Sequence, residues 1–561
     1  MNLLSKFRMQ LGVTVLLVSL HFSTTIAQSD PTGERRVTGT YAIKNATITT
    51  SPGTTVTNAT ILIKDGLIQA VGSNVPIPKE AQVINADSLY IYPGFIDGAS
   101  TAGVSKPAEV DRPSDFNPSN PPDEVAGITP WRTVLDYYDG KNSQVADWRK
   151  VGFTIAQVVP EGGMLPGKAA VVVLGSASST NVIAQNTALM AKFRGMGRGM
   201  YPGTQLGVMA KFRDLYKNAS YSAEHGRLFA STAGLQRPEI NKTYEAFYAV
   251  LDKNIPVLFE VSNDLEIRRA LKLQKENGFN IVLAGVNEVD AVIEDIKAAN
   301  AKVLLSFKLP DDKVTKSKVE DKSEEIQNRT KRVIEAYELA LKQAALLEEA
   351  NIPFAFGSMG ARSADLHKNL KIMVENGLSE KTALAALTTN AANILGIQKF
   401  AGTLEKGKLA NMVIMTDPIF SESAQIKHVV ADGYIFDYDV SKKKSNGNEE
   451  ASVEIEGSWE YVSDTPAGSS GGTMDIKKEG DGYKGTITYD NPAGGGKASS
   501  EMKDINISGN YMTFSFGVSA GGMSLDVTVS GDIQGDEFSG NMSLADFGSF
   551  PLNATKTPKQ R

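Results

Sequence analysis

The chain has 561 residues, of which 41% are hydrophobic and 22% charged, and its formal net charge is -6. These values are typical of a globular protein of about three domains and exclude a disordered or fibrous chain. The mild charge gives no reason to expect a nucleic acid or an anionic membrane surface as a partner.

The first 27 residues are typical of a secretory signal peptide. Lys6 and Arg8 form a positive start, residues 11–20 (LGVTVLLVSL) are apolar, and small residues up to Ala27 offer a cleavage site. An N-terminal membrane anchor is the alternative, but an apolar run of about ten residues is too short to span a bilayer. No later segment approaches ~20 apolar residues, so we expect no membrane span in the mature protein.

The chain contains no cysteine and only four histidines, of which His21 lies in the signal peptide. An exported protein without cysteine has no disulfide, no thiolate metal ligand and no cysteine nucleophile. It also lacks the cysteine on which a lipid anchor could be built after cleavage. We therefore expect a periplasmic or secreted protein without a lipid tether.

Taken in chain order, the pattern of apolar and polar residues in the mature sequence changes three times. Residues 37–92 alternate apolar and polar side chains as β-strands do, and Asp65-Gly66 is a strong two-residue hairpin signal. From about residue 150, apolar strands such as IPVLFEVS (255–262) alternate with helical segments, which indicates parallel β/α units and, over some 300 residues, a (β/α)8 barrel. Residues 401–440 return to β-like patterns.

The remaining sequence predicts a separate C-terminal domain. The polar run SKKKSNGNEE (441–450) is typical of a linker, and residues 451–561 read as short alternating strands joined by Gly-containing turns. This pattern predicts a small antiparallel β-barrel. The segment EGSWEYV resembles the opening strand of the lipocalin-like barrels appended to exported amidohydrolases, and we expect Trp459 to fill the barrel end rather than to bind a ligand.

Several motifs of the longer region resemble the amidohydrolase superfamily, and most closely its exported imidazolonepropionase-like branch. They are PGFIDGAST (93–101), YPGTQLGVMAKFRDLYKNASYSAE (201–224), LHKNLKIMVENGLSEKTALAALTTNAANILG (366–396) and GTLEKGKLANMVIM (402–415). The resemblance implies a (β/α)8 barrel over 93–397, flanked by a small β-sandwich built from residues 37–92 and 398–440. It also implies hydrolysis of carbon–nitrogen bonds.

The same resemblance places the family's metal ligands at positions that carry other residue types in this chain. The family holds one or two divalent ions, such as zinc, with four histidines, an aspartate and a bridging lysine or glutamate. The corresponding positions in this chain are Ala99, Thr101, Glu260, Ala284 and Met359. Met196 is a candidate for the bridging position. A bound divalent ion makes water a nucleophile at neutral pH, so losing its ligands removes that chemistry. We therefore expect no metal cofactor.

Other polar residues near the expected strand ends offer a metal-free alternative. They are Asp97, Glu260, Ser262, Lys308 and Ser358. A pair such as Glu260 with Lys308 could act as acid and base, whereas structural roles in caps, ion pairs and solvated surface are the simpler interpretation. His225, His367 and His428 are interpreted as structural or surface residues, and two carboxylates are too few oxygens for Ca²⁺ or Mg²⁺.

Two hypotheses of function remain. In the first, the protein is a non-catalytic member of the family that forms a homo- or hetero-oligomer with an active amidohydrolase paralogue. In the second, it is a divergent hydrolase that cleaves a carbon–nitrogen bond without metal, using Asp97, Glu260 or Lys308. The residues do not indicate a substrate for either.

Overall fold

The computed structural model contains two compact units, residues 1–442 and 443–561. It describes residues 35–36, 39–108, 110–111, 117–176, 181–197, 199–311, 323–431, 433–440, 455–465, 468–480, 482–490, 496–508, 511–520, 523–544 and 548–557. The predicted signal peptide and the predicted linker 441–450 lie outside these residues. Among the described helices, none combines the length and the apolar character that crossing a membrane requires.

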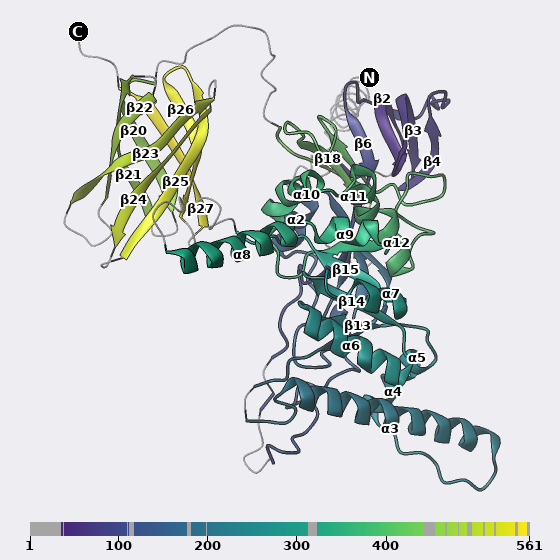
Figure 1. Ribbon diagram of the computed structural model, residues 1–561. Helices are drawn as coiled ribbons and strands as arrows, with labels where there is room; N and C mark the ends of the chain where they lie inside the picture. The colour runs from purple at the N-terminus through teal and green to yellow at the C-terminus, as the bar shows by residue number, and fades with distance from the viewer. Residues whose placement is uncertain are drawn as a thin grey trace, which may run out of the picture. The chain divides into compact units, whose positions relative to one another are not determined.

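Both ends of the larger unit contribute to one nine-stranded sheet. Its strands are β1 (Arg35–Arg36), β2 (Thr40–Ser51), β3 (Thr54–Lys64), β4 (Leu67–Gly72), β5 (Gln82–Asn85), β6 (Tyr90–Pro93), β17 (Met412–Met415), β18 (Ile426–Ala431) and β19 (Tyr434–Asp437). The order is β1-β19-β18-β17-β6-β2-β3-β4, with β5 on β2 (Figure 1). The hairpin at Asp65-Gly66 is confirmed, since both residues have positive φ, as a type I′ turn requires.

Two further sheets form the central barrel. Their strands are β7 (Phe95–Ser100), β8 (Phe153–Val158), β9 (Gly167–Lys168), β10 (Ala170–Val173), β11 (Val182–Ala184), β12 (Leu189–Lys192), β13 (Val257–Glu260), β14 (Ile281–Val286), β15 (Lys302–Ser306) and β16 (Phe354–Gly357). One sheet has the order β11-β10-β8-β7, and the other β16-β15-β14-β13-β12-β9. The amide of Ser358 joins the two sheets at the carbonyl of Ala99, 3.0 Å away.

The two barrel sheets also meet at β9 and β10, and this junction departs from a regular β/α alternation. β9 and β10, separated only by Ala169, run antiparallel to their neighbours β12 and β8. Only residues 159–166 connect β8 to β9. A parallel crossover needs a dozen or more residues, so this connection is too short to return the chain and the strand runs backwards. β10 also pairs antiparallel with β11, whereas the neighbours from β12 to β16, and β7 with β8, are parallel.

Helices alternate with the barrel strands, as the sequence predicts. They are α2 (Ser143–Lys150), α3 (Gln205–Ser231), α4 (Lys242–Glu245), α5 (Tyr248–Leu251), α6 (Asp264–Asn277), α7 (Ile293–Ala298), α8 (Glu324–Leu341), α9 (Gln343–Glu349), α10 (Leu366–Glu375), α11 (Glu380–Leu387) and α12 (Thr389–Leu395), with short 3₁₀ turns at Val134–Asp136 and Ser363–Asp365. α6 shows why such segments form: Asn263 caps its start, Gly278 ends it in the left-handed region, and its buried face carries Ile267 and Leu271.

The barrel strands separate two layers of apolar side chains. On β13, Leu258 belongs to one buried cluster, together with Ala284 and Leu304 of the next two strands. Its neighbours Val257 and Phe259 belong to a second cluster, which includes helix residues such as those of α6. Because side chains alternate across a strand, the first cluster is the barrel interior and the second is the packing between strands and helices.

The C-terminal unit is a closed antiparallel barrel, as predicted. Its strands are β20 (Gly457–Thr465), β21 (Gly468–Glu479), β22 (Gly482–Asp490), β23 (Lys497–Ser508), β24 (Tyr511–Ala520), β25 (Met523–Gln534), β26 (Glu537–Leu544) and β27 (Gly548–Lys556). Trp459 is fully buried among apolar residues that include Phe514 and Phe516. Its indole N–H donates to the carbonyl of Ile455 at 2.9 Å, so the ring has a core role with its polar atom satisfied.

Candidate functional site

The candidate site is the mouth of the barrel, where the carboxyl ends of the parallel strands come together. In such barrels, ligands and catalytic groups are held at this face. Two carboxylates lie there in different local environments. Asp97 lies on β7, beside the end of β16, and Glu260 is the last residue of β13. The residues around each carboxylate determine what it can do.

Asp97 is fully buried, and its carboxyl group accepts hydrogen bonds from backbone amides rather than from solvent. Its Oδ1 accepts the amide of Ser358 at 2.9 Å and that of Ala99 at 3.2 Å. The hydroxyls of Ser100 and Ser358 are 2.8 Å apart and hydrogen-bond to each other. Asp97 Oδ2 has no hydrogen-bond partner among the residues that the structure describes. The carboxyl group therefore ties the first barrel strand to the last.

Burial makes Asp97 a weak acid. Desolvation raises the pKa of its carboxyl from 3.8 to about 7, although hydrogen bonds from the side chain and amide of Ser358, the side chain of Ser100 and the amide of Ala99 oppose this rise. Removing a charged oxygen from water is costly, and the protonated form avoids that cost. Near neutral pH the carboxyl group is therefore partly protonated. Its role is to hold the ends of β7 and β16 together.

Glu260 pairs with a lysine that the sequence analysis did not single out. Lys192 ends β12, directly opposite Glu260 in the register of the two parallel strands. Its Nζ is 2.8 Å from Glu260 Oε2, and the side chains are 14% and 38% exposed. Both residues follow interior positions by two, Met190 and Leu258, so their side chains point into the mouth. The pair has no net charge. Among the positions where the family resemblance places metal ligands, Glu260 with its partner Lys192 is the one that carries charged side chains.

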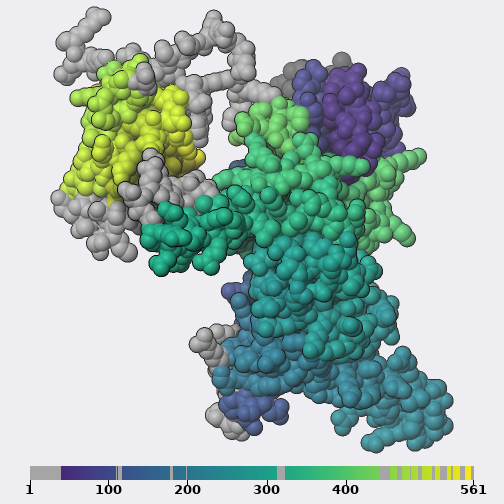
Figure 2. Space-filling model, in the orientation of Figure 1, coloured from purple at the N-terminus to yellow at the C-terminus, as the bar shows by residue number. Residues whose placement is uncertain are grey.

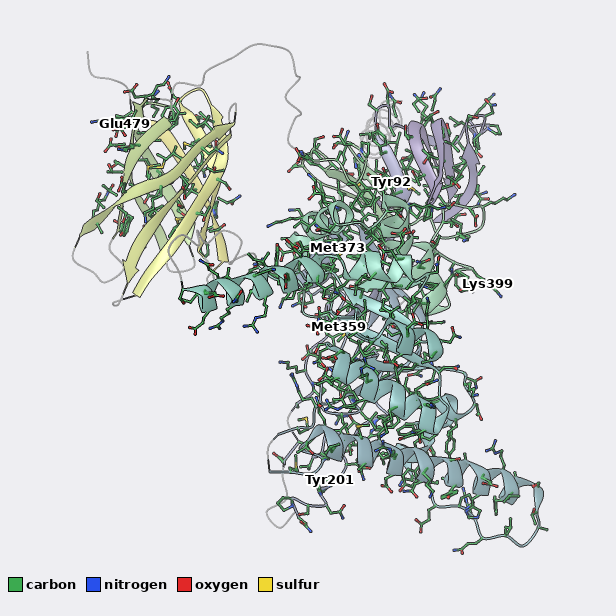
Figure 3. The ribbon with its side chains drawn as sticks, viewed as in Figure 1. Tyr92, Tyr201, Met359, Met373, Lys399 and Glu479 are labelled. Atoms are coloured by element: carbon green, nitrogen blue, oxygen red, sulfur yellow. The ribbon has the colours of Figure 1, made fainter. Side chains whose placement is uncertain are left out.

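The other positions at which the resemblance places metal ligands contribute no charged donor. Ala99 and Ala284 are fully buried in the interior cluster, and Met359 packs against that cluster (Figure 3). Thr101 follows the end of β7 and is half-buried. Among the described residues there is no group of three or more histidine, aspartate or glutamate side chains that could hold a metal. The residues present do not fit a catalytic zinc, which needs three such ligands and an open position.

The remaining candidates lie outside this pair. Lys308 follows β15 and is exposed, and its amide donates to the Ser306 hydroxyl at 3.2 Å. The hydroxyl and the amide of Ser262 both donate to Glu266 at the start of α6. Met196, the candidate for the bridging position, is 46% exposed in the loop beyond β12. The structure thus brings Glu260 together with Lys192 and leaves Lys308 in solvent.

The three histidines in the described part of the chain all have local partners. The ring of His225 hydrogen-bonds to the carbonyl of Gln236, that of His367 to the carbonyl of Val151, and that of His428 to the carboxylate of Asp437. Burial lowers the pKa of His367, so its ring is neutral near pH 7. These contacts are structural.

Lys192 could have been recognised in the sequence by its position. It ends the short apolar run Leu189–Lys192, just as Glu260 ends Val257–Glu260. Charged residues that directly follow two consecutive parallel strands lie side by side at the carboxyl edge of the sheet. The run 189–192 is only four residues long, so it does not stand out as a strand in the sequence.

The fold and its mouth define a β/α-barrel protein with a composite β-sheet. Residues 259–436 match the pattern that defines the Amidohydrolase family. An L-hydantoinase from Paenarthrobacter aurescens is 24% identical over 259 residues, which are 45% of this chain and 53% of that protein, so the match spans about half of the relative's length. The chain therefore carries an amidohydrolase-family domain.

One solved structure supports the fold, and a second is more distant. An amidohydrolase from Thermotoga maritima MSB8 aligns over 71% of this chain and 100% of its own length, with a TM-score of 0.57 and 21% identity. A Xaa-Pro dipeptidase with bound methionine aligns over the same shares with a TM-score of 0.42 and 16% identity. At such identities the likeness to the first structure concerns the fold alone.

Proposed function

We propose that this chain is an exported amidohydrolase-family protein that performs no metal-assisted hydrolysis and acts by pairing with an active homologue. One observation carries the first part: the barrel mouth offers Ala99, Thr101, Ala284 and Met359 where the family resemblance places metal ligands. The fifth position, Glu260, is already neutralised by Lys192. A methyl group or a thioether cannot hold a catalytic zinc.

A surface on α3 supports the pairing. The buried residues of this helix end at Ala219, and its second half extends from the body of the unit (Figure 2). Along this half Tyr221, Leu228 and Phe229 are 57%, 50% and 39% exposed. Three large apolar side chains in one helical segment are what a protein partner would cover.

Export is proposed from the N-terminal sequence. A positive start, a short apolar run and small residues before Gln28 favour a cleaved signal peptide, and the lack of cysteine disfavours a lipid tether. The mature protein would then act in the periplasm or outside the cell. N-terminal sequencing of the protein from a cell envelope fraction tests this, and an intact Met1 in the cytoplasm would contradict it.

A second candidate function is favoured by the Lys192–Glu260 pair. A carboxylate and an ammonium 2.8 Å apart at a barrel mouth can serve as base and acid for cleavage of a carbon–nitrogen bond without metal. In this version Glu260 activates water and Lys192 protonates the leaving nitrogen. The Glu260→Gln variant keeps the size of the side chain and removes the base.

Two measurements on the same purified mature protein separate the candidates. We expect far less than one zinc per chain by elemental analysis, and no hydrolysis of small amides, cyclic amides or dipeptides. Stoichiometric metal after dialysis would contradict the main proposal. Hydrolysis at ordinary enzyme rates that Glu260→Gln abolishes would establish the second candidate instead.

Pairing is tested by co-expression with an amidohydrolase homologue that has the full set of metal ligands. Complex formation by sedimentation velocity should be lost in the double variant Tyr221→Ser/Leu228→Ser. Leu265 on α6 is 56% exposed outside this surface, so Leu265→Ser is the matched control and should pair normally. Equal pairing by both variants would show that α3 is not the interface.

A further inference from the structure

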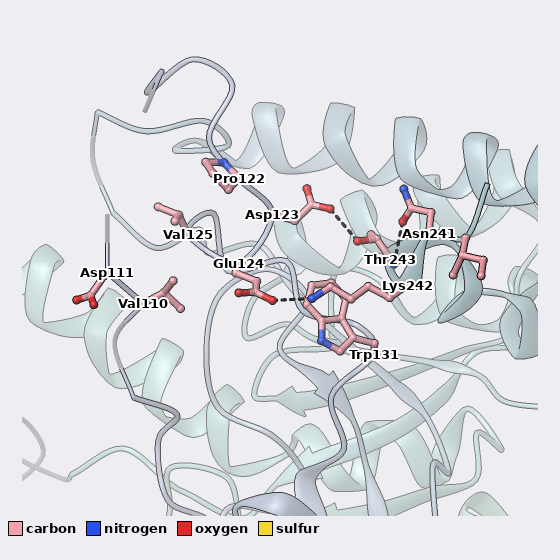
Figure 4. Close-up of a pocket in the computed structure, with 11 residues that line it drawn as sticks. Val110, Asp111, Pro122, Asp123, Glu124, Val125, Trp131, Asn241, Lys242 and Thr243 are labelled. Carbon is pink, nitrogen blue, oxygen red and sulfur yellow. Dashed lines mark hydrogen bonds and ion pairs between the residues drawn. The ribbon is translucent and has the colours of Figure 1, made fainter. Parts of the chain in front are cut away.

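A pocket of about 520 Å³ lies apart from the Lys192–Glu260 pair, between the segment before Trp131 and the start of α4 (Figure 4). Val110, Val125 and Ile240 contribute apolar walls, and Asp111, Asp123 and Glu124 contribute carboxylates. Its volume is within the range of small-molecule and side-chain sites. The pocket therefore combines an aromatic ring, apolar walls and negative charge.

One cation already occupies part of this pocket, and it belongs to the chain itself. Lys242 Nζ is 2.7 Å from Glu124 Oε1 and 4.0 Å from the centroid of the Trp131 ring. An indole face and a carboxylate on either side of an ammonium are what proteins use to bind cations. The Lys242 side chain is 59% exposed, so it can move away without disturbing the core.

The charges of the pocket are not balanced by this lysine. Asp123 accepts the hydroxyl of Thr243 at 2.7 Å, and its only ion-pair contact in the described part of the chain is Lys211 at 3.9 Å. Asp111 has no ion-pair partner among the described residues. Among the lining residues three carboxylates meet one ammonium, while Lys211 and Arg132 act on Asp123 and Glu124 from outside the lining. Asp111 is therefore the carboxylate that a further cation would neutralise.

The pocket is part of the loop layer at the carboxyl ends of the barrel strands. Ile128, between Glu124 and Trp131, pairs with Leu165 in the loop that follows β8. A side chain added at Gly127 would meet Gly163 and Met196, which lie in the loops after β8 and β12. The walls that carry Glu124 and Trp131 are therefore held by the barrel frame, which preorganises the site.

We propose that this pocket binds an arginine side chain of a peptide, and that Lys242 is its internal competitor. A guanidinium group stacks on an indole ring and can bond a carboxylate through two N–H groups, which an ammonium cannot do. The apolar walls suit the methylene stem of arginine. The inference does not depend on whether the barrel mouth catalyses a reaction.

N-acetyl-arginine amide is the probe, titrated into the full-length mature protein by calorimetry. N-acetyl-citrulline amide, which has a similar shape and no charge, is the comparison. We expect arginine binding that weakens with added salt and no detectable citrulline binding. Glu124→Gln should weaken arginine binding roughly tenfold or more, because a charge-assisted hydrogen bond is lost.

The variant Lys242→Ala gives the sharper result because its effect has the opposite sign. Removing the competitor should tighten arginine binding by roughly threefold or more, the range of a cation–π contact. Lys217, whose Nζ lies 5.6 Å from the Tyr221 ring outside the pocket, provides the matched control Lys217→Ala, which should change nothing. If neither wild type nor Lys242→Ala binds arginine, or if citrulline binds equally, the pair only fastens α4 to the loop and the proposal is wrong.

Discussion

The barrel mouth carries one carboxylate on each of two sides, and the chain uses them differently. At the seam of β7 and β16, Asp97 is fully buried and accepts two backbone amides. On β13, Glu260 is 38% exposed and faces the ammonium of Lys192. One oxygen of the first carboxylate is held by two backbone amides of the fold, whereas the second carboxylate belongs to a partly exposed side chain at the mouth.

This difference shows which of the two carboxylates at the barrel mouth stays available for chemistry. A buried acid that closes the barrel cannot change its partners without opening the seam between the first and last strands. An ion pair at the rim can exchange its partner for a ligand at little cost, because rim pairs contribute little to stability. Four substitutions or titrations test this contrast, in order of decreasing effect.

The largest effect is expected from Asp97→Ala. The substitution leaves the buried amides of Ser358 and Ala99 without their acceptor, and each unsatisfied group costs about 1–3 kcal/mol. We expect a loss of about 3 kcal/mol or more in the free energy of unfolding, measured by urea denaturation. Asp97→Asn keeps an acceptor oxygen and should lose only about 1 kcal/mol. Equal losses would show that the amide contacts do not matter.

The pH dependence of stability gives the next largest effect. The folded pKa of Asp97, about 7, lies above its unfolded value of 3.8, so the folded state binds the extra proton between these values. Its contribution is therefore complete at low pH and is lost as pH rises towards 7, at no more than about 1.4 kcal/mol per pH unit. The stability difference between wild type and Asp97→Asn isolates this slope.

That difference also removes the contribution of other groups. Burial lowers the pKa of His367, which makes the folded state more stable as pH rises through the normal range of histidine, and this effect is common to both proteins. We expect the stability advantage of wild type over Asp97→Asn to shrink from pH 4.5 to pH 7. A flat difference would mean that Asp97 titrates normally.

The rim pair should show a small coupling. A double-mutant cycle with Lys192→Met and Glu260→Gln is expected to give about 0.5–1 kcal/mol, reduced by added salt because Glu260 is more than a third exposed. Urea denaturation of the four proteins measures it. A coupling of several kcal/mol would mean that the pair is buried and rigid, and it would contradict the conclusion that Glu260 is more accessible than Asp97.

The smallest effect is expected from Lys308→Ala. Its side chain is exposed, and the bond to Ser306 is made by its backbone amide, which the substitution keeps. The free energy of unfolding should change by less than about 0.5 kcal/mol. A larger loss would reveal a contact of Lys308 at the mouth and would restore it as a candidate partner of Glu260.

Much of the architecture could be predicted because it depends on local patterns. The short apolar run IPVLFEVS before a helical segment, the Asp65-Gly66 turn and the regular strand spacing after residue 451 each indicate their element from local sequence. Correspondingly, β13 (Val257–Glu260), the β3–β4 hairpin and the closed C-terminal barrel are all present. The reversed strand at β9 and β10 was not predicted, because an apolar run does not reveal the direction in which it pairs.

The site was predictable only as far as residue types allow. That Ala99, Ala284 and Met359 cannot ligate a metal follows from their side chains. That Glu260 pairs with Lys192 and not with Lys308 depends on strand register, because β12 and β13 are neighbours while Lys308 lies beyond β15. Burial likewise separates Asp97 from Glu260, although both are carboxylates at strand ends.

The sequence by itself determined the α/β class and the separate C-terminal barrel, because composition and periodicity carry this information directly. The absence of histidine at the positions of the metal ligands was implied by the resemblance to the amidohydrolase superfamily. The tertiary structure decided which charges meet: Lys192 with Glu260 across 2.8 Å, and Lys242 with Glu124 and Trp131 across more than a hundred residues of chain. It also decided that Asp97 is buried away from water and is therefore a weak acid. These properties arise from distance and burial, which only the folded chain sets.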